Sequence, residues 1–489
     1  MAISHHTSRS PVLDRWREGR ALREAAEDRT FSGPLPVQVS NGEETSFSIP
    51  FVANYSKSLP HNEFGEVDRN AYRMLLRAVG TGNPEDFERI PLGLEDGRPL
   101  ANPQAGLSFD LEGPDPQGLV IPPAPRIDGP ENSAEMGELY WMALARDVKF
   151  TDFATDPIVA DAADDLTEGF SDFRGPREGG RVTPRTLFRG FTPGDLAGPY
   201  LSQFLLFDVP YVTLRLTQRQ DTVEPGVDFV TDFEDWLRLQ NGEPRDLIDR
   251  DFTNTRYIQT PRDMAHYVNF DALFEAYLNA AFILVTRPSP PEVMPLGAPV
   301  DAGNPYNFSC NQVGFATYGA PHVLTLVAEV ATRALKAVWF QKWFVHRRLR
   351  PEEFGGRIEV QLDRDPGRYD GIIDPEILDS DVLGRVKDRF GSYLLPQAFP
   401  EASPTHPAYG AGYATVAGAC VTILKAWFDE SFVIPNPVVP NEDGTGLVPY
   451  TGPDKDRLTV GGELNKLAAN ISIEATFTLT RFDGTTIQI

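Results

Sequence analysis

Hydrophobic residues recur at helical intervals from about residue 131 onward. Apolar positions spaced three and four residues apart are typical of helices that bury one face. The segments with this spacing are 136–150, 195–207, 229–240, 265–286, 322–349 and 413–428. The pattern predicts a mainly α protein whose helices form bundles connected by long loops.

The N-terminal part of the chain has a different pattern. Residues 1–35 are charged and then rich in turn residues, which predicts a surface helix and arm, and residues 36–127 are rich in turn signals. We therefore expect residues 1–130 to form an arm and loop-rich region that packs on a helical body of residues 131–489. Short strands are predicted at 47–52 and at 476–489, where DGTT supplies a tight turn.

The most apolar helical segment is 265–286, and it contains Asp271, Glu275 and Asn279. These polar groups would be costly in hydrocarbon, so we expect a buried helix and no membrane span. The N-terminus lacks the apolar run that a secretory signal needs. We expect a soluble protein that is cytoplasmic by default.

Charge narrows the choice of partners. The 489 residues include 70 Asp and Glu against 45 Lys and Arg, which gives a formal net charge of −25. Such a surface repels a phosphodiester backbone, so nucleic acid is excluded as a partner. The two cysteines, Cys310 and Cys420, match no close-spaced metal or redox pattern, and we interpret them as ordinary buried thiols.

One basic stretch stands out against this acidic background, at residues 339–351 (WFQKWFVHRRLRP). It contains four cationic side chains, Lys342, Arg347, Arg348 and Arg350. Helical rotation would place Lys342, His346 and Arg350 on one stripe, and Pro351 would end that helix just after Arg350. The stretch predicts an anion site at a helix end, with a solvated basic face beside a core helix as the alternative.

A glycine turn follows at residues 403–413 (SPTHPAYGAGY), ahead of a segment rich in small residues. Glycines at 410 and 412 would allow close approach to backbone amides at a helix N-terminus, which is a natural cradle for an oxyanion. The alternative is a tight turn chosen for packing.

Together with further segments of the chain, the basic stretch and the glycine turn resemble the vanadium-dependent haloperoxidases of the bromoperoxidase type. These are related to the type 2 phosphatidic acid phosphatases. The resemblance covers roughly residues 38–473 and the closing FDGTTIQI. It is carried by Lys342 with Arg350-Pro351-Glu352, by SPTHPAYGAGYAT at 403–415, and by HNEFGEV at 61–67, NPQAGLSFDLEG at 102–113, GPYLSQFLLFDVPY at 198–211, VDFVTDFEDWLRLQNG at 227–242, GNPYNFS at 303–309 and LTVGGELNKLAANISI at 458–473.

The resemblance implies a mainly helical fold of two four-helix bundles with long loops, a vanadate cofactor and a homo-oligomer. It implies oxidation of bromide or another halide by hydrogen peroxide to hypohalous acid, which halogenates an organic acceptor. In that reaction vanadate acts as a Lewis acid.

The resemblance also assigns roles to residues. Lys342 and Arg350 match the basic residues that bind vanadate and polarise peroxide, and Gly412 matches the glycine whose backbone N–H binds a vanadate oxygen. His406 matches a histidine near the halide site, and Trp339 matches a position that is aromatic or arginine in the family. Lys342, Arg350 and His406 are thus the candidate catalytic residues, and Trp339 and His406 the candidate halide site.

Three features depart from the family pattern. The family reads Ser-Gly-His in the glycine turn, whereas this chain has Ala411 and Tyr413 around the glycine, which replaces a vanadate-binding serine and an acid–base histidine. The family then continues after its ANISI-like segment to an arginine and to the histidine that bonds vanadium. Here no histidine follows His406, which indicates a deletion near 473/474 and the loss of the axial metal ligand.

Three hypotheses follow from this comparison of residues. The first is an active haloperoxidase in which a repositioned residue such as His346 compensates. The second is a degenerate, non-catalytic family member that binds phosphate-like anions. The third is a phosphatase, which is disfavoured because the nucleophilic histidine of that chemistry has no counterpart in this chain.

Overall fold

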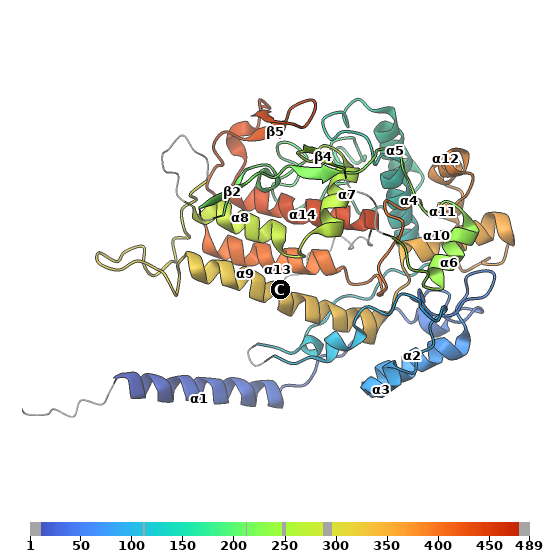
Figure 1. Cartoon of the computed structure of the whole chain (residues 1–489), viewed down its shortest axis with the longest axis horizontal. Helices are drawn as coiled ribbons and strands as arrows, with labels where there is room; N and C mark the ends of the chain where they lie inside the picture. Colours follow the sequence, from blue (N-terminus) through green and yellow to red (C-terminus); the bar gives the residue numbers. More distant parts are fainter. Residues whose placement is uncertain (1–10, 111–112, 212, 247–250, 287–295, 479–489) are drawn as a thin grey trace, which may run out of the picture.

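The computed structural model describes residues 11–110, 113–211, 213–246, 251–286 and 296–478. Within this part the fold is mainly helical, as predicted (Figure 1). The α-helices are α1 (Pro11–Ser32), α2 (Arg69–Thr81), α3 (Pro84–Phe87), α4 (Pro130–Leu144), α5 (Pro157–Glu168), α6 (Phe233–Gln240), α7 (Pro261–Phe270), α8 (Glu275–Val285), α9 (Ala320–Phe340), α10 (Pro351–Glu359), α11 (Pro375–Leu378), α12 (Asp381–Phe390), α13 (Gly412–Trp427) and α14 (Val460–Thr478). Short helical turns connect them, of which η2 (Pro103–Leu107), η4 (Gln203–Leu205) and η5 (Gln341–His346) bear on the site.

The centre of the molecule is a group of long helices that lie side by side. α13 packs against α9 and α14, and α14 also packs against α7 (Figure 1). Buried Ala417, Ala419 and Cys420 on α13 keep these contacts close, because small side chains let helix backbones approach. This group surrounds the cavity described below.

A second group of helices packs around α4, which contacts α5, α11 and α12. α10 joins the molecule through α6, where Trp236 lies flat against Gly356 with no room for a Cβ. The Trp236 indole Nε1 donates to the Glu352 carbonyl at 3.0 Å. This contact fixes the first turn of α10, which carries residues of the site.

Strands are few and form three separate antiparallel pairs among the described residues. They are β1 (Val209–Tyr211) with β2 (Leu214–Leu216), β3 (Gln220–Thr222) with β4 (Asp251–Arg256), and β5 (Val438–Pro440) with β6 (Leu447–Pro449). The predicted strand at 47–52 is wrong, because serines and Pro50 break that segment into turns and Phe51 takes a positive φ of 65°. The predicted strand at 476–489 is also wrong as far as Thr478, where α14 continues, and its remaining residues lie outside the described part.

Two helices predicted from periodicity differ in the structure. Residues 195–207 form turns and the short η4, because Gly198 at φ 68° and Pro199 interrupt the helical pattern. The segment 265–286 is divided between α7 and α8, which are bent by 96° relative to each other. In the described part no single helix has both the length and the apolarity to cross a bilayer, and only this bent pair reaches them jointly. A cytoplasmic location stays a prediction.

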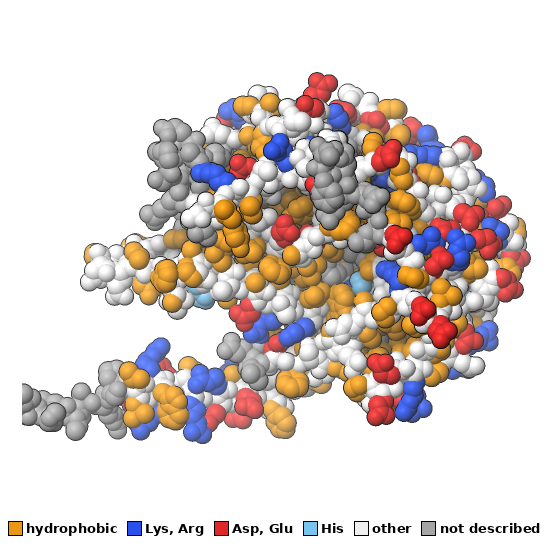
Figure 2. All heavy atoms as spheres, viewed as in Figure 1, with side chains coloured by type: hydrophobic (Ala, Val, Ile, Leu, Met, Phe, Trp, Pro, Cys, Tyr) orange, Lys and Arg blue, Asp and Glu red, His pale blue; other side chains and the backbone are white. Residues whose placement is uncertain are grey.

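The N-terminal region has a hydrophobic cluster of its own. Buried residues between 51 and 90, mostly from α2 and the loops beside it, pack around Trp343, whose ring meets Tyr55 edge-on at 5.5 Å. α1 projects from the body as an exposed arm, as predicted, and Figure 2 shows hydrophobic side chains along it. The division into regions at residue 130 stays a prediction. Cys420 is buried as expected, but Cys310 is exposed, and the two thiols are unpaired.

Candidate anion-binding site

The basic stretch is not one continuous helix. α9 ends at Phe340 and continues as the π-helical turn η5, which ends where Arg347 takes a left-handed conformation with φ 42°. Pro351 then begins α10, with Arg350 as its N-cap, because proline fits the first helical position. The predicted single stripe through Lys342, His346 and Arg350 is therefore wrong, and so is the expectation that Pro351 ends the helix.

Lys342 is a buried cation. Its Nζ donates to the backbone carbonyls of Pro407 at 2.7 Å and Ala408 at 2.8 Å, and it lies 5.8 Å from the ring centre of Trp339. Burial, together with the nearby charge of Arg350, lowers the pKa of Lys342 well below its ordinary value. None of the described carboxylates pairs with it. The Lys342 amino group is thus held by carbonyl dipoles, with no anionic counter-charge from the described part of the chain.

Arg350 is directed at the same loop from the other side. Its Nη1 lies 3.3 Å from the His406 carbonyl oxygen and 3.5 Å from that of Pro407. Burial lowers the pKa of Arg350 to about 10, which still leaves the guanidinium charged at neutral pH. The fold therefore brings Lys342 and Arg350 to the same 406–408 segment, although they do not share the predicted helical stripe.

His406 lies between these cations and Trp339. Its ring centre is 4.7 Å from that of Trp339, and its Nδ1 is 3.0 Å from the Pro407 carbonyl oxygen. Burial and the charges of Lys342 and Arg350 hold the pKa of His406 well below its ordinary value, so the ring is neutral. The neutral tautomer that matches the carbonyl has its proton on Nδ1, which leaves Nε2 as an acceptor.

Gly412 begins α13, and Ala411 is its N-cap without any side-chain capping bond. The first amides of a helix have no intrahelical acceptor and carry the positive end of the helix dipole. A Cβ at position 412 would stand 3.5 Å from Trp339 Cζ3, in ordinary van der Waals contact with the ring. The N-terminus of α13 therefore lies beside the Trp339 ring, and its role as an oxyanion cradle stays a prediction.

A cavity of about 320 Å³ joins these elements, and we call it the anion cavity. Its walls come from α7, α9, α13, α14 and the loops before α13. The lining residues are Arg98, Val268, Asn269, Leu273, Leu335, Trp339, Lys342, Glu401, Ala402, Pro404, His406, Ala408, Ala411, Gly412, Tyr413 and Ser472. Arg350 stands behind the His406 and Pro407 carbonyls and is not part of the lining.

His346 does not reach the anion cavity. It is buried elsewhere, edge-on to Tyr409 with ring centres 4.9 Å apart, and its two ring nitrogens have no hydrogen-bond partner among the described residues. Burial, followed by the charges of Arg347 and Arg348, lowers its pKa to about 3. The structure therefore gives no support to His346 as a replacement for a lost site residue.

Tyr413, which stands where the family has histidine, lines the anion cavity and points its hydroxyl away from the cations. Its Oη lies 2.6 Å from the Val268 carbonyl oxygen and 2.9 Å from Oδ1 of Asp271. Burial raises the pKa of Asp271 to about 7, against the Tyr413 hydrogen bond, which lowers it. Burial and Asp271 together raise the pKa of Tyr413.

Sequence reasoning missed Arg98, Asp271 and Ser472. Arg98 lines the cavity with Nη1 bound to the Glu401 carbonyl at 2.8 Å, and Ser472 comes from α14. Arg98 lies in a turn-rich segment without a recognisable motif. Asp271 entered the sequence analysis only as a polar residue that disfavours a membrane span. No local motif marks either residue, because each contacts a residue of the site that is more than a hundred positions away in the sequence.

A buried ion pair supports the loop that carries His406. Lys57 Nζ donates to both oxygens of Glu352 at 3.0 Å and to the Ser403 carbonyl at 2.7 Å. Ser403 in turn donates its backbone N–H and its hydroxyl to Glu352, each at 2.6 Å. Burial lowers the pKa of Lys57 to about 8 although Glu352 favours its charged form. This network ties α10 to the start of the 403–413 turn.

Comparisons with known proteins agree with this geometry. No family model matches the chain. Vanadium-dependent bromoperoxidases from Corallina pilulifera and Corallina officinalis are each 36% identical to it, over 92% of this chain and 88% of theirs. A vanadium-dependent bromoperoxidase from Ascophyllum nodosum is 35% identical over 95% of this chain and 84% of its own length.

A solved structure shows the same fold. The homohexameric second vanadate-dependent bromoperoxidase from Ascophyllum nodosum matches with a TM-score of 0.88 and 28% identity, over 99% of this chain and 85% of that chain. The likeness thus extends through nearly all of the sequence, including the helices that surround the anion cavity. On the strength of these relatives, which cover more than nine tenths of its length, the chain belongs to the family of vanadium-dependent bromoperoxidases.

Proposed function

We propose that this chain is a vanadate-dependent haloperoxidase that oxidises bromide, or another halide, with hydrogen peroxide and so halogenates an organic acceptor. The observation that carries the proposal is the buried Lys342 ammonium group beside the N-terminus of α13, in a cavity of a family member. A cation at such a place, with no carboxylate partner among the described residues, is stabilised by a bound anion.

The donors present fit an oxyanion such as vanadate. Lys342 would hold it with its ammonium group, and the first amides of α13 at Gly412 would add further donors from the same cavity lining. Arg350 adds positive charge from behind the 406–408 carbonyls. Vanadate, when bound, supplies the Lewis acidity that makes peroxide electrophilic.

The chain's own residues prepare the cavity for this reaction. Lys342 and the α13 dipole stabilise negative charge on oxygen, and their effect is strong because the site is buried. Trp339 is fixed by its Nε1 bond to the Ala101 carbonyl at 3.1 Å, and its ring and the neutral His406 form one wall. We place the halide against this wall, where the Trp339 and His406 ring centres lie 4.7 Å apart.

The replaced residues define what this site lacks. Ala411 offers no hydroxyl to the anion, and the Tyr413 hydroxyl is bound to Val268 and Asp271 instead. The sequence after His406 contains no histidine, so none from that part of the chain supplies a nitrogen bond to the metal. We therefore expect this chain to bind vanadate more weakly than it would with a Ser-Gly-His turn, by about tenfold for one lost hydrogen bond to a charged group.

Assembly into a homo-oligomer is part of the proposal. It is supported by the homohexameric structure of the relative with the TM-score of 0.88. Analytical ultracentrifugation of the full chain would give the number of subunits, and a monomer at micromolar concentration would contradict this part.

The function is tested by peroxide-dependent bromination of a dimedone-type acceptor by the full chain incubated with vanadate. We expect turnover above that of free vanadate, and loss of this excess in Lys342→Ala. Lys336→Ala is the matched control, because Lys336 lies on α9, just before η5, but pairs with Asp110 outside the cavity. Equal rates for the chain and for free vanadate would overturn the proposal.

The two alternatives are separated in the same preparation. Tight vanadate binding without bromination would favour the non-catalytic member that binds phosphate-like anions, and inorganic phosphate should then compete for the site. Turnover of p-nitrophenyl phosphate would favour the phosphatase. We expect phosphate to compete with vanadate and p-nitrophenyl phosphate to remain intact.

A further inference from the structure

A carboxylate stands in the wall of the anion cavity. Among the described residues that line this cavity, Glu401 supplies the one carboxylate, whereas Arg98 and Lys342 supply cations. An ionised carboxylate can only accept hydrogen bonds, and the same is true of a fully ionised oxyanion. The two groups therefore repel each other unless the oxyanion carries a proton that lies between them.

The backbone of Glu401 is held in place by two cationic side chains. Its carbonyl oxygen accepts from Arg98 Nη1 at 2.8 Å and from Lys57 Nζ at 3.3 Å. Lys57 is buried and also forms the ion pair with Glu352 that supports the loop before α13. Glu401 thus belongs to the same hydrogen-bonded framework, and its carboxylate meets the cavity from a fixed backbone position.

Arg98 is fixed by the segment that contains it. Its backbone N–H donates to the Gly242 carbonyl at 2.7 Å, and the backbone N–H of Ala101 donates to the Thr405 carbonyl at 2.8 Å. This segment is thereby bound to the loop that follows Glu401. None of the ion pairs among the described residues joins the Arg98 guanidinium to the Glu401 carboxylate. The positive charge of Arg98 is therefore available to an anion in the cavity.

The hydrogen bonds of the Glu401 carboxylate are incomplete. Its Oε1 lies 3.4 Å from Asn269 Nδ2, which is a long contact. Its Oε2 is buried and has no hydrogen-bond partner among the described residues. A buried carboxylate oxygen without a donor costs folding free energy. A hydroxyl group on a ligand in the anion cavity would supply this donor.

From this arrangement we propose that Glu401 is a specificity-determining residue, which selects oxyanions that carry a hydroxyl group over those that are fully ionised. The inference rests on the proposed function, and it names the class of oxyanion that the site takes. Lys342 and Arg98 donate to the ionised oxygens of the ligand, and the ligand hydroxyl donates to Oε2 of Glu401. Hydrogen bonds of this O–H···O⁻ kind are short and about twice as strong as those between neutral groups.

Vanadate and phosphate both meet this requirement. Each keeps at least one proton at neutral pH, whereas sulfate has the same tetrahedral shape and keeps none. A site that hydrogen-bonds a ligand hydroxyl discriminates against an analogue without it, because a polar group of the site is then left unpaired. Since Glu401 is half-buried, we expect the wild type to bind phosphate about 100-fold more tightly than sulfate.

The test compares these two anions in Glu401→Gln. The full chain is titrated calorimetrically at pH 7 with inorganic phosphate and, separately, with sulfate at equal ionic strength. The glutamine amide can donate its N–H to a sulfate oxygen, so sulfate should bind at least tenfold more tightly to the variant than to the wild type. Phosphate affinity should change less, and the preference should fall to about tenfold or below. A gain of sulfate affinity cannot result from misfolding.

Glu442→Gln is the matched control. Glu442 is exposed and lies outside the anion cavity, so this variant removes the same charge from the chain without altering the cavity wall. It should keep the wild-type preference for phosphate. A sulfate gain of the same size in Glu442→Gln would assign the effect to net charge and overturn the role of Glu401.

The outcomes separate this inference from the proposed function. A wild type without preference for phosphate, or an unchanged preference in Glu401→Gln, overturns the selectivity, and vanadate-dependent bromination would then still support the function. Phosphate binding that survives in Lys342→Met would place the anion outside the cavity and overturn the inference as well. A chain that binds neither phosphate nor vanadate contradicts the proposed function itself.

Discussion

At the scale of single residues, the site is defined by a positive charge that the protein does not neutralise. Lys342 is only 1% exposed, and its ammonium group is bound by two carbonyls and by no carboxylate that the structure describes. Burying a charge without a counter-charge costs folding free energy, which binding of an anion recovers. The arrangement therefore exchanges some stability of the empty protein for affinity toward an oxyanion.

This exchange predicts the behaviour of Lys342→Met. Methionine keeps the volume and removes the charge, so we expect a higher melting temperature than the wild type in the absence of vanadate. Vanadate should stabilise the wild type but not the variant, with at least a tenfold loss of affinity, or about 1.4 kcal/mol. Thermal unfolding with and without vanadate checks both points. A variant that is less stable when empty would contradict this account of the buried charge.

A second residue-scale prediction concerns pH. The folded pKa of Asp271, about 7, lies above its ordinary value of 3.8, so the folded chain binds the extra proton between these pH values. Its contribution to stability is complete below pH 4 and is lost as the pH rises to 7. From pH 5 to pH 8 the wild type should lose about 2–3 kcal/mol relative to Asp271→Asn. Urea unfolding at the two pH values measures this, and a constant difference would refute it.

The sequence predicted these site residues unevenly. Lys342 and Gly412 were singled out because each belongs to a local motif whose chemistry can be inferred from residue types, whereas His406 was assigned only through the family resemblance. Asp271 could not be predicted, since its partner Tyr413 is 142 positions away and only the packing of both α7 and α13 against α14 brings them together. The sequence placed Arg350 near Lys342 through a single helical stripe, which the structure does not contain.

At the scale of elements, periodicity located helices but not their breaks. Helical spacing runs through 322–349, yet the backbone widens to a π-turn at η5 and then turns at Arg347. It also runs through 265–286, yet α7 and α8 are bent by 96°. Both breaks bring polar groups to the site, Lys342 in one case and Asp271 in the other. Tertiary contacts determine where such helix breaks occur, and the spacing of apolar residues does not predict them.

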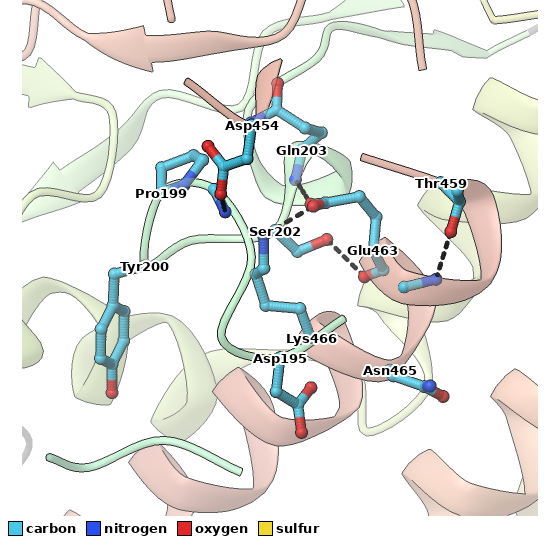
Figure 3. Close-up of polar contacts among 12 residues, drawn as sticks. Asp195, Pro199, Tyr200, Ser202, Gln203, Asp454, Thr459, Glu463, Asn465 and Lys466 are labelled. Carbon is cyan, nitrogen blue, oxygen red and sulfur yellow. Dashed lines mark hydrogen bonds and ion pairs between the residues drawn. The ribbon is translucent and has the colours of Figure 1, made fainter. Parts of the chain in front are cut away.

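The position of α14 depends on a buried ion pair beside η4. Lys466 Nζ donates to Oε1 of Glu463 at 2.6 Å, and the backbone N–H of Gln203 donates to Oε2 of Glu463 at 2.8 Å (Figure 3). The Ser202 hydroxyl donates to the Glu463 carbonyl at 2.8 Å, so the loop before η4 is bound to the first turns of α14. Further along, the same helix contributes Ser472 to the anion cavity.

This arrangement predicts strongly coupled substitutions on α14. Glu463→Ala leaves Lys466 buried and unpaired, and should destabilise the chain by about 3–5 kcal/mol. Combining Glu463→Met with Lys466→Met should cost less, about 1–2 kcal/mol, mainly for the Gln203 amide that loses its acceptor. Urea unfolding of Glu463→Met, Lys466→Met and the double variant gives the coupling.

Glu18→Ala on the exposed arm α1 is the control, because Glu18 forms a pair with Arg15 at the same spacing of three residues. It should cause no measurable change, since exposed pairs contribute little. A double variant as unstable as Glu463→Ala would show that the loop contacts, and not the charge pair, position α14.

At the scale of the whole molecule, the net charge opposes the ligand that the cavity attracts. The chain carries −25, while acidic and basic side chains are mixed over the face seen in Figure 2. An anion approaching from solvent is therefore repelled at long range and attracted only near the buried cations. The sequence supplied the total charge, but only the fold shows that Lys342 is separated from it by burial.

This contrast predicts an unusual dependence on ionic strength. The screening length falls from about 30 Å at 0.01 M salt to about 8 Å at 0.15 M, which weakens the long-range repulsion but hardly affects the buried site. Vanadate should therefore associate a few-fold faster as salt increases, followed through the fluorescence of Trp339 at the cavity wall. Because salt anions also compete for the site, acetate and chloride are compared at equal ionic strength. An acceleration shared by both salts reports screening, and a slowing shared by both would show that the cavity cations, and not the net charge, control the encounter.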